Sequence, residues 1–155
     1  MLRPIVIATL IAGTLDIISA FVFSAMAGVS ALAVLKFVAS GPFGEAPTES
    51  LGWGLVGLAV HFTIMTCMVT AYMIVAPRIP ILLRQPIVAG ILYGILLWII
   101  MYWIVRPLRF PEMPLPHTLK GISQALFSHC ILVGIPIALV ASRFFRPGPP
   151  KSALA

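Results

Sequence analysis

The sequence has few charged residues. Of its 155 residues, only 10 are Lys or Arg and 4 are Asp or Glu, so charged residues make up 9% of the chain. A soluble domain carries about a quarter charged residues, and so few charged side chains cannot cover the surface of a small water-soluble globule. The composition therefore excludes an ordinary soluble domain. Since 61% of the residues are hydrophobic and the mean hydropathy is +1.11, it favours an integral membrane protein.

Acidic residues are scarcer than basic ones, which gives a net charge of +6 and a pI of about 10.0. The excess arises from missing acids and not from a Lys/Arg cluster that follows phosphates, so nucleic acid is not expected as a partner. Cysteine is also scarce. Cys67 and Cys130 lie in apolar runs without a CxxC partner or metal-ligand spacing, where a thiol acts as a small hydrophobic group.

Four apolar runs are long enough to cross a bilayer, which takes about 20 residues of helix. They cover residues 4–27, 52–76, 87–105 and 119–142, and prolines mark several ends: Pro4, Pro77, Pro86 and Pro107. Runs of this length without alternation are typical of α-helices, because backbone polar groups in lipid must be paired within the chain. We predict an all-α integral membrane protein, with a four-helix transmembrane bundle over residues 1–146. The proline-rich segment 147–155 is predicted to be a disordered tail.

The first run also has features of a signal peptide, with Arg3 before it and Ala25-Met26-Ala27 as a cleavage-like site. Its apolar stretch is too long for such a peptide, and Asp16 interrupts the middle. We therefore expect a membrane span.

The distribution of charge predicts the orientation. With four spans, the N-terminus, the 77–86 loop and the tail share one side. That side carries six basic residues and no acid: Arg3, Arg78, Arg84, Arg143, Arg146 and Lys151. The other side mixes basic and acidic residues: Lys36, Arg106, Arg109, Lys120, Glu45, Glu49 and Glu112. Because Lys and Arg are enriched in cytoplasmic loops, both termini are predicted to be cytoplasmic.

Residues 28–50 do not form a regular span. Leu32, Leu35 and Phe37 flank Lys36 in a pattern that predicts a short interfacial helix, and segment 39–44 (ASGPFG) is typical of a tight turn. The segment fits either a surface cap on the bundle or a re-entrant loop.

Three ionisable residues lie within the spans: Asp16, His61 and His129. Each is about ten residues from the same end of the bundle, so all three are expected about 15 Å below that boundary. An Asp at such a depth costs about 2.5–3.5 kcal/mol, so it should face the bundle interior or a wet cavity. We predict that the three side chains form one intramembrane polar site.

A weak internal repeat adds Tyr93 to the candidate site. Segment 12–16 (AGTLD) is similar to segment 89–93 (AGILY), and each is followed by a span with one histidine. A parallel repeat would pair Asp16 with Tyr93 and His61 with His129.

Several chemistries fit these residues. Asp16 with the histidines would relay a proton or bind a small ligand, and this is the function that we predict, without a metal or cofactor. Alternatively, His61 and His129 would ligate a haem b iron, or two histidines and a carboxylate would hold a metal ion. In a purely structural accessory subunit, Asp16 would only hydrogen-bond a neighbour and fix the helix register. No residue pattern nominates a catalytic nucleophile, so an enzyme is not expected.

The order of the motifs resembles that of an uncharacterised family of four-span bacterial inner-membrane proteins. The first half carries Leu15-Asp16-Ile17, the segment 38–44 (VASGPFG) and His61-Phe62, and the second half carries segments 90–94 (GILYG) and 134–139 (GIPIAL) after His129. The resemblance implies a location in the bacterial inner membrane and no particular activity. Tyr102 and Arg109 depart from the family pattern. So small a bundle leaves little room for a transport path, so a homo-oligomer or a larger membrane complex is expected beside the lipid bilayer.

Overall fold

The computed structural model describes residues 1–44, 50–115 and 118–146. Within these ranges the chain is helical and contains no β-strand, which confirms the all-α fold class. The predicted disordered tail, together with Glu45 and Glu49, lies outside the described residues.

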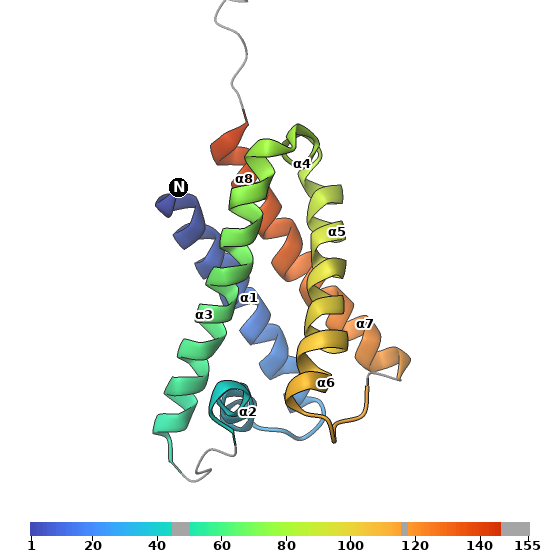
Figure 1. The fold of residues 1–155 in the computed structure, drawn as a ribbon. Helices are drawn as coiled ribbons and strands as arrows, with labels where there is room; N and C mark the ends of the chain where they lie inside the picture. Colours follow the sequence, from blue (N-terminus) through green and yellow to red (C-terminus); the bar gives the residue numbers. More distant parts are fainter. Residues whose placement is uncertain (45–49, 116–117, 147–155) are drawn as a thin grey trace, which may run out of the picture.

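Four helices are long and apolar enough to cross a membrane, and they lie side by side in one bundle (Figure 1). The first is α1 (Leu2–Ala25), and the second is α3 (Gly52–Val75) with the 3₁₀ turn η1 (Ala76–Arg78). The third joins α5 (Pro86–Ile99), the π-helical η2 (Ile100–Val105) and α6 (Arg106–Arg109). The fourth joins α7 (Leu119–Phe127), the π-helical η3 (Ser128–Gly134) and α8 (Ile135–Phe145). Two short helices, α2 (Ala31–Phe43) and α4 (Pro80–Arg84), complete the fold.

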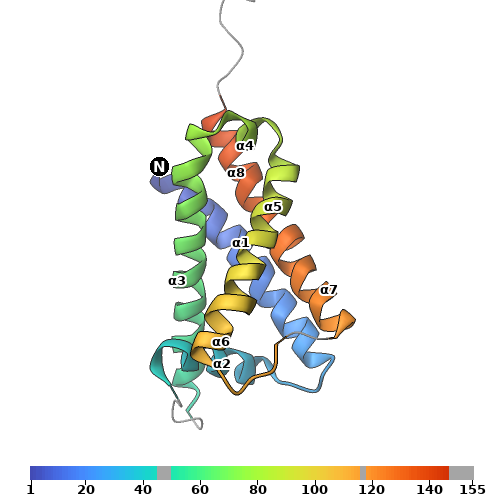
Figure 2. The ribbon, with the colours of Figure 1, turned by 45° about the vertical axis from the view of Figure 1, so that its right-hand side comes forward.

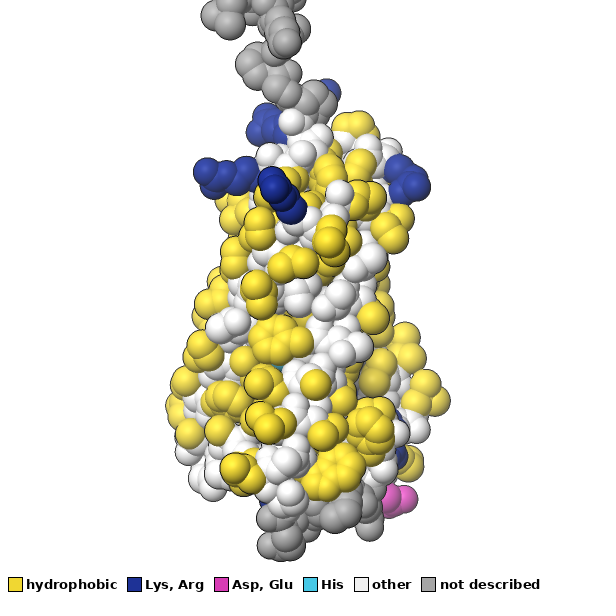
Figure 3. All heavy atoms as spheres, turned by 90° about the vertical axis from the view of Figure 1, so that its left-hand side faces the viewer, with side chains coloured by type: hydrophobic (Ala, Val, Ile, Leu, Met, Phe, Trp, Pro, Cys, Tyr) yellow, Lys and Arg dark blue, Asp and Glu magenta, His cyan; other side chains and the backbone are white. Residues whose placement is uncertain are grey.

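The outward faces of the bundle are apolar. Large hydrophobic side chains are exposed along the long helices, among them Leu10, Leu55 and Leu92 with 56%, 70% and 61% of their surface accessible. In the space-filling view, hydrophobic side chains cover the middle of the molecule and Lys and Arg gather at the end near α4 (Figure 3). Apolar surface of this extent is stable against lipid and not against water. The chain is therefore a multi-pass membrane protein.

Tight packing is concentrated toward the α4 end of the bundle. The fully buried side chains there come from α1, α3 and α8, among them Ala8, Met73, Ile137 and Ala141. Glycines allow the closest helix contacts. A Cβ atom on Gly90 would lie 2.6 Å from the Cα of Ile135, so α5 and the fourth span meet backbone to backbone. This close packing leaves the open space of the bundle at the other end, near α2.

Both π-helical segments end two residues before a proline. The amide of Arg106 donates to the carbonyl of Met101, and that of Ile135 to Cys130, five residues back in each case. Pro107 and Pro136 follow, each at the start of the next α-helical segment. The wider turn accommodates a proline that lacks an N–H and crowds the preceding carbonyl. The prediction that Pro107 closes the third span is therefore wrong, because the helix continues for one more turn to Arg109.

The short helix α2 lies across the end of the bundle, transverse to α3 (Figures 1 and 2). It begins at Ser30, whose hydroxyl accepts from the amide of Ala33, and its last residue precedes Gly44, which has a φ of 78°. The predicted short helix is confirmed, but the predicted tight turn over segment 39–44 is wrong because the helix runs through Pro42. Arg109 donates to the carbonyls of Ser40 and Gly41 and satisfies this last turn from outside.

Candidate functional site

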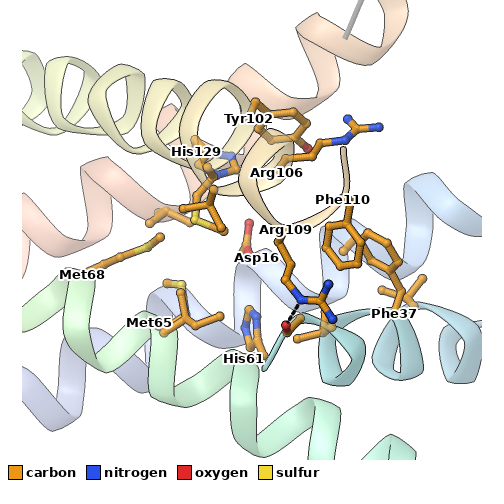
Figure 4. Close-up of a pocket in the computed structure, with 18 of the residues that line it drawn as sticks. Asp16, Phe37, His61, Met65, Met68, Tyr102, Arg106, Arg109, Phe110 and His129 are labelled. Atoms are coloured by element: carbon orange, nitrogen blue, oxygen red, sulfur yellow. Dashed lines mark hydrogen bonds between the residues drawn. The ribbon is translucent and has the colours of Figure 1, made fainter. Parts of the chain in front are cut away.

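A cavity of about 670 Å³ lies between the four spans and α2. Asp16, His61 and His129 all line it, although they come from α1, α3 and η3. The close-up shows Asp16 between the two imidazoles (Figure 4). The three ionisable residues that the sequence predicts at one depth therefore line one cavity.

His61 is held by the backbone of a neighbouring span. Its Nε2 lies 2.9 Å from the carbonyl oxygen of Gly13, and only 7% of the residue is exposed. A carbonyl oxygen can only accept, so Nε2 carries the proton and Nδ1 is left as the free, unprotonated nitrogen. This bond fixes the ring against α1, next to Phe62 at 5.2 Å between ring centroids.

His129 is held within its own span. Its Nδ1 lies 2.9 Å from the carbonyl oxygen of Ala125, so Nδ1 donates and Nε2 is left free. The ring packs edge-on against Tyr102, with centroids 5.8 Å apart. The two histidines therefore have opposite tautomers, and each keeps one nitrogen for a ligand or a proton.

Asp16 is partly buried and lacks a fixed partner. Within the ranges that the structure describes, its carboxylate makes no hydrogen bond and no close ion pair, although His61 and His129 line the same cavity. Nearby hydroxyl groups bond elsewhere: Ser19 donates to the backbone carbonyl of Asp16 and pairs with Ser128 at 2.8 Å. The carboxylate is therefore open to a proton or to a ligand in the cavity.

Tyr93 does not line this cavity. Its hydroxyl donates to the carbonyl of Met68 at 2.6 Å, and its ring lies 4.9 Å from that of Tyr72. Tyr72 belongs to the hydrophobic core, and Tyr93 packs against it. The structure thus separates Tyr93 from the Asp16 site, and gives it a place in helix packing.

Replacing Tyr93 with Phe is expected to lower the free energy of unfolding by about 1 kcal/mol, because it removes one interhelical hydrogen bond and keeps the ring. Unfolding of the purified protein in mixed micelles measures this change. The titration of Asp16 should be the same as in the wild type. An altered Asp16 titration at unchanged stability would contradict the structural role of Tyr93.

Three residues outside the predicted site also line the cavity. They are Tyr102, Arg106 and Arg109. Hydropathy alone places them at the end of the third span, where such residues commonly anchor a helix to the headgroups. In the structure Tyr102 belongs to η2, Arg106 and Arg109 belong to α6, and all three line the cavity instead. The sequence carried one signal for this, since Tyr102 and Arg106 are four residues apart and therefore share one face of a helix.

A second cavity, of about 520 Å³, adjoins the first. Asp16, Tyr102, Arg106 and His129 line both cavities, which makes these residues the boundary between them. α7 and the segment before it close the second cavity on its far side, through Thr118, Gln124 and Leu115.

The histidines and Asp16 are not arranged as a three-ligand metal site. Among the described residues, no group of three or more His, Cys, Asp or Glu side chains is placed to hold a metal ion. Bis-histidine haem ligation stays a prediction, for which Nδ1 of His61 and Nε2 of His129 are the free nitrogens. Cys67 and Cys130 are free thiols, one exposed and one buried.

The resemblance to a four-span bacterial family stays a prediction. Comparisons of the chain with protein family models, with curated proteins and with solved structures find no match.

Proposed function

We propose that this membrane protein binds a small ligand in its intramembrane cavity and that occupancy is coupled to protonation of Asp16. His61 and His129 flank the carboxyl group. The observation that carries the proposal is that the Asp16 carboxylate, in a cavity between the spans, has no hydrogen-bond partner among the described residues. A carboxylate at membrane depth needs a proton, a cation or a hydrogen-bond donor, and no side chain in the described ranges supplies one.

The purely structural alternative expects a different arrangement. An Asp that fixes helix register would hydrogen-bond a neighbouring helix, as buried polar groups in membrane bundles commonly do. Here other residues make those bonds: His61 with Gly13, Ser19 with Ser128, and Tyr93 with Met68. The bundle is therefore held together without Asp16, which favours a functional role for its carboxyl group.

The groups that face Asp16 across the cavity determine how it titrates. These groups come from four elements: His61 from α3, His129 from η3, Tyr102 from η2, and Arg106 and Arg109 from α6. The residues of α2 that line the cavity are apolar or glycine. The charges and dipoles of these groups form the electrostatic surroundings of the Asp16 carboxyl group.

Infrared difference spectroscopy of the detergent-purified protein between about pH 5 and about pH 8 tests the coupling. We expect a carboxyl stretching band that appears on acidification, and we expect Asp16→Asn to remove it. Asp16 is well suited to this measurement because it is the only Asp in the chain, and the other acids are Glu45, Glu49 and Glu112.

The matched control is Glu112→Gln, which removes an exposed carboxyl group from the loop after α6. It should leave the Asp16 band in place. If wild type and Asp16→Asn give the same pH difference spectrum, Asp16 does not exchange a proton in this range and the proposal fails. A visible spectrum of the same sample tests the haem alternative, because bound haem gives a Soret band that His61→Ala or His129→Ala would abolish.

A further inference from the structure

We infer that the ligand of the cavity is an amphiphile, with an anionic phosphate or carboxylate headgroup on an apolar chain. The inference rests on the proposed function and names the class of its ligand. Three features carry it: the charge of the cavity, an arginine with an unpaired buried nitrogen, and a lining that changes from basic to apolar with depth.

The fixed charges of the cavity favour an anion. Arg106 and Arg109 line it from α6, and among the described residues that line it Asp16 is the only acid. With neutral histidines, the net charge is positive even when Asp16 is ionised. Protonation of either histidine or of Asp16 makes it more positive. A basic pocket between membrane spans is a typical binding site for lipid headgroups.

Arg106 has donors that no residue in the described part of the chain uses. Its Nε is fully buried without a hydrogen-bond partner, and its guanidinium lies 5.8 Å from the centroid of the Tyr102 ring. A buried, unpaired guanidinium nitrogen is costly unless a ligand satisfies it. The planar fork of arginine matches the oxygen atoms of a phosphate or carboxylate. Arg106 is therefore the group that would recognise the headgroup.

Arg109 plays a different part. It already donates to the carbonyls of Ser40 and Gly41, and it lies over the ring of Phe110 at 5.2 Å. Phe110 in turn stacks on Phe37 of α2, with 4.8 Å between centroids. Arg109 thus fixes α2 as a wall of the cavity and adds positive charge to it.

The lining becomes apolar away from the arginines. Met65 and Met68 lie on the opposite side of Asp16 from Arg106 and Arg109 (Figure 4). Arg109 ends the third span, whereas Met68 lies 16 residues into α3 from Gly52, or about 24 Å along a helix. An amphiphile with its headgroup at Arg106 and its chain toward Met68 would have the orientation of a lipid in the surrounding bilayer. Methionine side chains suit a flexible acyl chain because they adapt to irregular shapes.

Asp16 lies beside the proposed path of this ligand. Asp16, Tyr102 and Arg106 all line this cavity, so a headgroup at Arg106 would share the cavity with the carboxylate. An ionised Asp16 repels an anionic headgroup, and a protonated Asp16 does not. The ligand is therefore expected to bind more tightly at low pH, and Asp16→Asn is expected to bind at high pH as tightly as the wild type binds at low pH.

Native mass spectrometry of the full chain in neutral detergent tests the ligand class, with dodecyl phosphate and dodecanoate as probes. Dodecanol is the uncharged probe of equal chain length, and inorganic phosphate is the headgroup without a chain. We expect one dodecyl phosphate or one dodecanoate per chain, with both dodecanol and inorganic phosphate about tenfold weaker or more. Arg106→Gln should weaken dodecyl phosphate about tenfold, and Arg106→Lys should weaken it less.

Lys36→Gln is the matched control, because Lys36 lies on α2 near the same end of the bundle but does not line either cavity. It should bind the probes as the wild type does. Equal binding of dodecanol and dodecyl phosphate to the wild type would overturn the inference without any variant. Equal losses in Arg106→Gln and Lys36→Gln would overturn it as well.

The same titration at about pH 5 and about pH 8 separates the two proposals. Tight binding of dodecyl phosphate with no pH dependence, and no infrared band from Asp16, would overturn the proton coupling and leave the ligand class standing. An Asp16 band without binding of either anionic probe would overturn the ligand class alone. If inorganic phosphate binds as tightly as dodecyl phosphate, the ligand is a free anion and the amphiphile is excluded.

Discussion

Replacing Gly94 with alanine is expected to destabilise the whole bundle by about 3 kcal/mol, the upper end of the usual cost of overpacking. The added Cβ would lie 2.5 Å from the Cα of Cys130 and closer still to the carbonyl oxygen of His129. Both are backbone atoms of η3, which no change of rotamer can move. The only way to accommodate the methyl group is to push α5 and the fourth span apart, and these spans form the most extensive interface near the site.

The free energy of unfolding in mixed micelles measures this effect. Gly41→Ala is the control, because a Cβ there meets no atom within 4 Å and the residue is also within a helix. We expect Gly41→Ala to be neutral or slightly stabilising, since alanine restricts the unfolded chain more than glycine does. If Gly94→Ala and Gly41→Ala have the same stability, α5 does not pack against η3 as closely as described.

Gly57→Ala is expected to have a large local effect and to detach α2 from α3. A Cβ on Gly57 would lie 2.6 Å from the carbonyl carbon of Leu35 and nearer to its oxygen. Because α2 contacts α3 more extensively than any other element, the clash displaces the wall of the cavity. The helices of the packed α4 end lie farther away and should keep their contacts.

Hydrogen exchange measured by mass spectrometry distinguishes this outcome from global unfolding. In Gly57→Ala, amides of residues 31–43 should exchange at least about tenfold faster, while those of α5 and α8 should keep their wild-type protection. Gly54→Ala is the matched control on the same face of α3. Its added Cβ would meet Leu32 Cδ1 at 2.7 Å, a flexible side-chain end that can turn away. Equal exchange of α2 in both variants would contradict the close contact at Gly57.

The exchange pattern also bears on the proposed ligand. Since α2 supplies one wall of the cavity through Phe37, Val38 and Pro42, its displacement should weaken dodecyl phosphate binding without removing Arg106. A helix that contributes only to the surface of the bundle would leave that binding unchanged.

The sequence determined the four spans and the shared depth of three polar residues. Span lengths follow from hydropathy, because lipid excludes unpaired backbone groups and leaves the helix as the available structure. The fixed rise of a helix then places Asp16, His61 and His129 at one level. These inferences need no knowledge of which helices are neighbours. They therefore come from the chain alone, and the cavity that these residues line agrees with them.

The surroundings of these side chains, and the residues at which the helices end, depend on tertiary contacts. Pro107 and Gly41-Pro42 are local signals for a helix end, yet the π-helical turn before Pro107 and the donors of Arg109 keep both segments helical. The weak repeat groups Tyr93 with Asp16, but the packing of α5 on α3 turns its hydroxyl to Met68. Arg106 lines the cavity, although it stands at the end of an apolar run. Each outcome depends on contacts between residues far apart in the sequence, and local propensity carries no information about such contacts.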